Sequence, residues 1–115
     1  MRFIALGVVA AAFAGTAWAH HGWSSYDSAR QQNVTGTIAE LKWAQPHAIL
    51  WVNSEGKRLE VWLSPLQRMV DRGLNKEALT VGKTITVDAQ PSTVNADEWK
   101  AHSITVDGKN YDLMR

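Results

Sequence analysis

The chain has 115 residues, with 12 lysines and arginines, 11 aspartates and glutamates, and a formal net charge of +1. This length fits one small domain, and the balanced charge gives no indication of a nucleic-acid or anionic-membrane partner. The absence of cysteine excludes a disulfide framework, a thiolate metal site, a cysteine nucleophile and a lipid-modified cysteine.

The N-terminus has the order of a secretory signal peptide. Arg2 gives a positive start, residues 3–14 are apolar or glycine, and an Ala-Trp-Ala sequence ends at Ala19. The apolar run is shorter than the roughly 20 residues of a membrane-spanning helix, so an uncleaved anchor is the weaker alternative. We therefore expect residues 1–19 to be a signal peptide, with His20 as the first mature residue and no stable membrane insertion after cleavage.

Removing Arg2 leaves 11 basic residues against 11 acidic ones, so the mature chain is near neutral when its histidines are uncharged. Export without disulfides favours a bacterial periplasm. Residues 20–32 are polar and irregular, which predicts a flexible N-terminal segment in front of a folded domain at residues 33–115.

The first half of this domain shows the alternation of β-strands. Between residues 33 and 44 the apolar phase shifts from Val34 and Ile38 to Leu41, which predicts a β-bulge near residues 39–40.

Residues 48–53 and 57–63 predict a hairpin with residues 54–57 as its turn. Matching the apolar faces places Leu50 opposite Val61 and Val52 opposite Leu59.

A single helix is predicted after the hairpin. Ser64 is the expected N-cap, Pro65 the first helical residue and Gln67 the partner in a capping box. Leu66, Met69 and Val70 form the expected apolar stripe, which Gly73 ends, and residues 75–79 form a second short turn.

Strands are then expected at residues 83–89, 98–106 and 109–113, with a polar loop at residues 90–97. Three strands, a helix and two further strands, with a bulged first strand, is the order of an OB-type barrel. The predicted fold is therefore mainly β: a small OB-type β-barrel of five to six strands with one helix between strands 3 and 4. A small open α+β sheet is the alternative.

The segments AHH, TGTIAELKWAQPHAILWV, EVWLSPLQRMVDRGL and ITVDGKNYDL carry a family resemblance. They resemble a family of small exported bacterial proteins that is classed as a domain of unknown function and is itself similar to periplasmic OB-fold proteins. Gln45 stands where the family pattern has Asn in Asn-Pro-His. The resemblance implies a fold, and it implies no activity.

The sequence contains no Gly-rich phosphate loop, no H-E-x-x-H and no G-x-S-x-G, so we expect no enzyme. The histidines indicate a metal site instead. A mature N-terminal His20 would offer copper both its amine and its imidazole, with His47 as the favoured third nitrogen ligand and His21 or His102 as less favoured contributors. The plain alternative is that His20 and His21 belong to an exposed tail and that His47 and His102 are ordinary strand histidines.

Two tryptophans indicate a second function. In the predicted hairpin Trp51 and Trp62 share the face opposite Leu50 and Val61, with Trp62 across from Ile49 and diagonal to His47. They are either covered by the N-terminal segment and loops or exposed as a ligand-binding platform. The alternative function is thus a non-enzymatic interaction module that binds a peptide, a glycan or a periplasmic protein.

Overall fold

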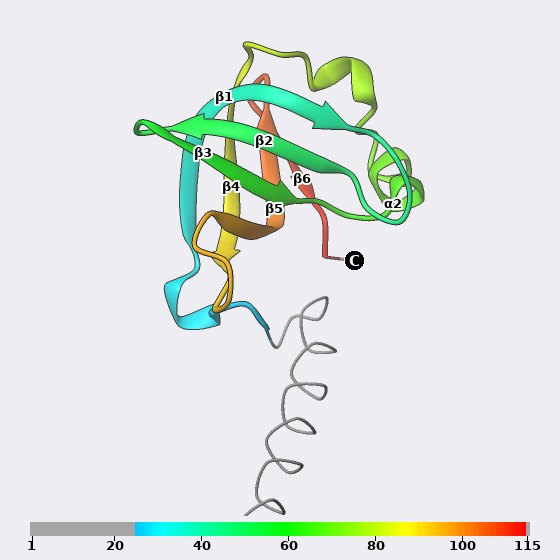
Figure 1. The fold of residues 1–115 in the computed structure, drawn as a ribbon. Coiled ribbons are helices and arrows are strands. Elements are labelled where there is room, and N and C mark those ends of the chain that lie inside the picture. Colours follow the sequence, from blue (N-terminus) through cyan, green and yellow to red (C-terminus); the bar gives the residue numbers. More distant parts are fainter. Residues whose placement is uncertain (1–24, 115) are drawn as a thin grey trace, which may run out of the picture.

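The computed structural model describes residues 25–114 (Figure 1). Within this part of the chain, six strands form one sheet that closes on itself, because β3 pairs with β5 as well as with β2. The strands are β1 (Gln32–Lys42), β2 (Ile49–Ser54), β3 (Lys57–Trp62), β4 (Thr84–Pro91), β5 (Glu98–Val106) and β6 (Lys109–Asp112). The helical elements are η3 (Ser28–Arg30), α2 (Leu66–Asp71) and η4 (Lys76–Ala78).

The closed order β1-β2-β3-β5-β4 is that of an OB-type barrel, with β6 added beside β5. The parallel pairing of β3 with β5 closes the barrel and excludes the open sheet. The predicted fold class is therefore confirmed, including one helix between the third and fourth strands.

The predicted bulge in β1 is present. Its pairing with β2 shifts between Ile38 and Glu40, which bends the strand so that its first half pairs with β4 and its second half with β2.

The β2–β3 hairpin has the predicted register. Leu50 faces Val61 and Val52 faces Leu59. Glu55 and Gly56 form the turn with φ of 50° and 79°, the positive values that a tight two-residue hairpin turn requires.

The predicted start of the helix is wrong. The N-cap of α2 is Pro65, with no side-chain capping bond, because the buried Ser64 hydroxyl donates a hydrogen bond of 2.6 Å to the Leu113 carbonyl instead. Gln67 likewise forms no capping box and donates to Asp71. The Ser64 and Gln67 side chains, which the local sequence predicts as capping groups, therefore form their hydrogen bonds elsewhere in the folded protein.

The end of the helix follows the prediction. Gly73 has φ of 85°, its N–H donates to Val70, and the Leu74 N–H donates to Met69, which is the Schellman arrangement. The expected apolar stripe is only partly correct, since Met69 is buried but Val70 is 47% exposed.

The predicted polar loop after the fourth strand begins two residues too early. Gln90 and Pro91 belong to β4, because they pair with Lys100 and Trp99 of β5 beyond a bulge that leaves His102 unmatched in the register. The fifth strand has the predicted bounds, Glu98–Val106.

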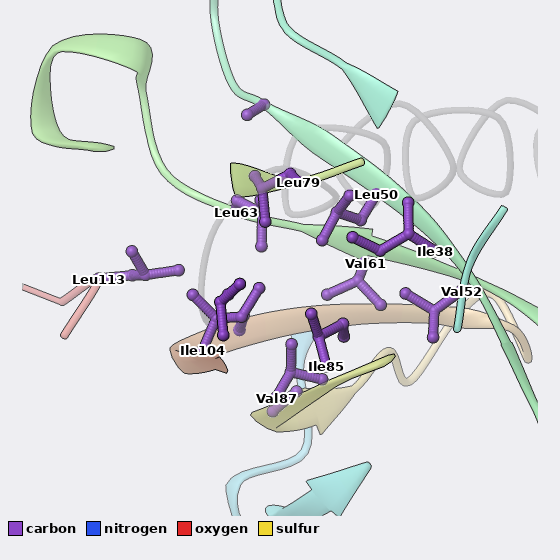
Figure 2. Close-up of a cluster of buried hydrophobic side chains, with 14 of the residues drawn as sticks. Ile38, Leu50, Val52, Val61, Leu63, Leu79, Ile85, Val87, Ile104 and Leu113 are labelled. Atoms are coloured by element: carbon purple, nitrogen blue, oxygen red, sulfur yellow. The ribbon is translucent and has the colours of Figure 1, made fainter. Parts of the chain in front are cut away.

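The barrel interior is filled by the inward residues of every strand, and Figure 2 shows Ile38, Leu50, Val61, Ile85 and Ile104 converging there. Leu63, Leu79 and Leu113 extend this core beyond the strands. Because the inward residues are apolar and large, the barrel is a packed core rather than a channel.

The described part of the N-terminal segment lies against the barrel. Tyr26 forms an isolated antiparallel β-bridge with Ser92, and the Asp27 N–H donates a hydrogen bond of 2.9 Å to the Pro91 carbonyl. Residues 25–31 therefore run beside the loop between β4 and β5 (Figure 1). Across residues 25–114 no helix has the length and apolar character needed to cross a membrane.

Candidate functional site

The outer face of β2, β3 and β5 carries the candidate site. In the strand register Ile49, Trp62 and Lys100 form one row across this face. Trp51, Glu60 and Glu98 form the neighbouring row. The loops at residues 43–48 and 92–97 border this face, which is where OB folds usually bind their ligands.

A cavity of about 160 Å³ opens on this face. It is lined by Tyr26, Pro46, His47, Trp62 and Lys100. The His47 and Trp62 rings lie 5.9 Å apart between centroids and are tilted by 58°. The Trp62 indole N–H donates a hydrogen bond of 2.8 Å to the Glu60 carboxylate, which holds the ring at the cavity that it lines.

Tyr26 forms the side of the cavity nearest the acidic residues. Its hydroxyl donates a hydrogen bond to Glu98, and the Lys100 amine lies 5.9 Å from the centre of its ring. Burial, then the hydrogen bond and charge of Glu98, and finally the charge of Glu60 raise the pKa of Tyr26 above its ordinary value. Tyr26 is therefore a neutral hydrogen-bond donor at physiological pH.

The other side of the cavity is basic. Burial, followed by the positive charge of Arg68, lowers the pKa of Lys100 below its ordinary value. Arg68, His47 and Lys100 also line an adjacent cavity of about 50 Å³. An anionic group bound beside Lys100 would offset the cost of holding two cations close together.

The structure separates some of the predicted site residues. His47 and Trp62 share a cavity, whereas Trp51 lies one row away with the Arg58 guanidinium 5.8 Å from its ring centre. Arg58 in turn bridges to Glu40 at 3.1 Å. Both tryptophans are partly exposed, so neither is fully covered.

His102 borders a different depression, with Asp88 and Asp112, and does not share a cavity with His47. His20 and His21 lie outside the described residues. Within residues 25–114 no three His, Asp or Glu side chains gather as a metal site.

Sequence reasoning missed Tyr26, Arg68 and Lys100. The position of Lys100 could have been derived, because barrel closure pairs β3 with β5 and sets Lys100 opposite Trp62. Tyr26 carries no such signal, since it precedes the first strand and is positioned by the loop that follows β4.

Fold and site together define a small OB-type β-barrel with an aromatic cavity on its outer face. The chain belongs to a family of unknown function, DUF6152, whose model matches residues 8–100. This confirms the predicted membership of a family without assigned function. No curated protein matches the chain.

Among solved structures the chain is similar to a chain in the crystal structure of the S. pombe Stn1-Ten1 complex, with a TM-score of 0.53 and 18% sequence identity. The match covers 64% of this chain and 55% of that chain, so it spans little more than half the length of the solved protein. This likeness supports the barrel fold.

Proposed function

We propose that this protein is an exported, non-enzymatic binding module of the bacterial periplasm that uses the outer face of β2, β3 and β5 to hold a protein partner. The observation that carries the proposal is the cavity formed by Trp62 and His47 beside Lys100. A partly exposed tryptophan in a cavity is the kind of anchor that dominates many protein interfaces.

The size of the cavity favours a protein partner over a small ligand. Its 160 Å³ is well below the roughly 300–1,000 Å³ of typical small-molecule sites. It suits one large apolar side chain of a partner. That the similar solved protein comes from a complex of two proteins is consistent with this use of the fold.

The charges beside the cavity indicate which residue of the partner would lie next to the inserted apolar side chain. Lys100 lines the cavity, and Arg68 lines the adjacent small cavity that shares Lys100 and His47, so an acidic residue next to the inserted apolar one would lie on the side of these two cations. The expected recognition element is therefore an aromatic or large aliphatic residue adjacent to Asp or Glu.

The test uses the protein purified after export and two short peptides, one with Glu beside Phe and one with Lys in place of that Glu. We expect the acidic peptide to shift the Trp62 indole N–H resonance saturably and the basic peptide to leave it unchanged. Trp62→Ala should abolish binding, and Trp51→Ala, one row away on the same face, should retain it.

Lys100→Gln should weaken binding of the acidic peptide. Lys42→Gln is the matched control, because Lys42 lies opposite Ile49 at the far end of the same row. Equal affinity for both peptides, or equal binding by wild type and Trp62→Ala, would refute the proposal.

Copper binding by the mature N-terminus is the second candidate function. The observation in its favour is that Tyr26, six positions after His20, lines the same cavity as His47. An extended chain covers about 3.3–3.6 Å per residue, so the amine and imidazole of His20 are within reach of His47. His21 is the further ligand, and His102 is less favoured because it borders another depression.

Titration of Cu(II) into the correctly cleaved protein, followed by electron paramagnetic resonance, tests this function. We expect a nitrogen-rich spectrum that is lost when one extra residue precedes His20, and is altered by His47→Ala but not by His102→Ala. Equal and weak binding with and without the extra residue would refute it. Trp62→Ala should leave copper binding intact, which distinguishes it from the partner site.

A further inference from the structure

The mouth of the barrel holds a separate cavity, which shares no lining residue with the cavity on the outer face. β1 pairs with β4 from Gln32 to Thr37, but its pairing with β2 begins only at Thr37. The first half of β1 therefore has no ladder partner in β2, although the Ser54 hydroxyl at the end of β2 still donates a hydrogen bond to the Thr35 carbonyl. A cavity of about 590 Å³ lies between this tip, β1 and the loop at residues 92–97.

The floor of this cavity is apolar. Val34, Leu59 and Trp99 line it, and all three belong to or pack against the barrel core. Trp99 is only partly buried, so it both closes the end of the core and borders the cavity. A flat aromatic ring at the base of a hollow suits a ligand with an apolar ring face.

The rim of the cavity is polar and electrically balanced. Arg30 and Lys57 stand against Glu55 and Asp97, two charges of each sign, so the rim favours a neutral ligand. Uncharged hydrogen-bonding residues complete the rim, namely Gln32, Ser54 and Ser92.

The edge of β1 adds backbone groups to this rim. Over residues 32–35 β2 provides no ladder partner, and these residues of β1 line the cavity. The Thr35 carbonyl accepts a 2.7 Å hydrogen bond from the Ser54 hydroxyl there, so a hydroxyl group is the kind of donor that this position accommodates. A ligand rich in hydroxyls can replace or extend such bonds.

We propose that the barrel mouth binds a neutral sugar of one or two rings, with the apolar face of one ring on Trp99 and its hydroxyls on Gln32 and the backbone of β1 at residues 32–35. The volume lies within the roughly 300–1,000 Å³ of small-ligand sites, unlike the smaller cavity on the outer face. This site is independent of the protein-partner function and of copper.

The probes are uncharged disaccharides, namely maltose, cellobiose and diacetylchitobiose, added to isotope-labelled protein and followed by NMR. We expect at least one of them to shift the Trp99 indole N–H and the backbone amides of residues 32–35 saturably. Trp99→Leu keeps an apolar side chain at the end of the core but removes the aromatic ring, so it should weaken sugar binding by about tenfold.

Gln32→Ala tests the rim without touching the core, because Gln32 is exposed. It should weaken sugar binding severalfold, while Gln67→Ala, an exposed glutamine on α2, should not. Trp62→Phe should also leave sugar binding unchanged, because Trp62 lies on the outer face.

The proposal is overturned if none of the three sugars shifts these resonances, or if wild type and Gln32→Ala bind equally. It is also overturned if an uncharged extended peptide of alternating Thr and Val shifts residues 32–35 and the sugars do not. That result would assign residues 32–35 of β1 to strand addition by a peptide.

Discussion

Trp62 on β3 and Lys100 on β5 stand opposite each other in the parallel pairing that closes the barrel. Lys100 has its amine 5.9 Å from the ring centre of Tyr26, and Trp62 has its ring 5.9 Å from that of His47. The same hydrogen-bonded contact that completes the fold therefore also joins the basic and aromatic sides of the candidate site.

Gly36→Ala should destabilise the barrel by about 2–3 kcal/mol, the cost of overpacking a tight contact. A Cβ at Gly36 would lie 2.4 Å from the Asn53 carbonyl oxygen and 2.7 Å from a Val52 methyl group. Urea unfolding measures the change. Gly56→Ala is the control, since it meets no atom within 4 Å and costs only the roughly 1 kcal/mol of a positive φ. A smaller loss at Gly36 than at Gly56 would contradict this account.

Ser64→Ala should cost about 1 kcal/mol, because it removes the buried hydrogen bond from Ser64 to the Leu113 carbonyl. Ser64→Asp decides between this role and an N-cap. Aspartate is a good N-cap but cannot donate to a carbonyl and would be buried as a charge, so we expect a loss greater than with alanine. If Ser64→Asp has the same melting temperature as the wild type, Ser64 acts as an N-cap after all.

Tyr26 should ionise at higher pH than an ordinary tyrosine. In a Tyr111→Phe variant Tyr26 is the remaining tyrosine, so ultraviolet absorbance follows its phenolate alone. Adding Glu98→Gln should lower the midpoint of the titration only in part, because burial is the larger cause of the raised pKa.

This raised pKa also sets the direction of a pH effect on stability. Above about pH 10 the unfolded chain loses the Tyr26 proton while the folded chain keeps it, so the contribution of Tyr26 to stability falls as pH rises further. Tyr26→Phe should reduce this loss in chemical unfolding measured between pH 9 and pH 11, values chosen to bracket the ordinary tyrosine pKa of about 10. An unchanged pH dependence would show that the hydroxyl is not responsible.

Export should yield a chain that begins at His20. Intact-mass analysis of a periplasmic fraction tests this prediction, and Ala19→Lys should block cleavage because a signal peptidase requires a small residue there. A mature chain that begins at Gly15 or Trp18, or an intact chain that begins at Met1, would contradict it and remove the basis for copper binding by His20.

The architecture of this barrel can be derived from local patterns in the chain. Alternation of side chains placed the strands, the phase change around Ala39 predicted the bulge, and the matched faces of Leu50 with Val61 set the hairpin register. These features are local or nearly so, because side-chain period and turn chemistry act within a few residues. The membership of a family without assigned function also followed from short segments.

The contacts between distant side chains, by contrast, depend on how the chain closes into a barrel. Ser64 is a good N-cap in isolation, yet the returning C-terminal segment brings the Leu113 carbonyl to its hydroxyl. Closure of β3 onto β5 brings Lys100 to Trp62, and the loop after β4 brings Tyr26 to Glu98. Such contacts join residues far apart in the chain, and their free energy depends on burial and distance that exist only after folding.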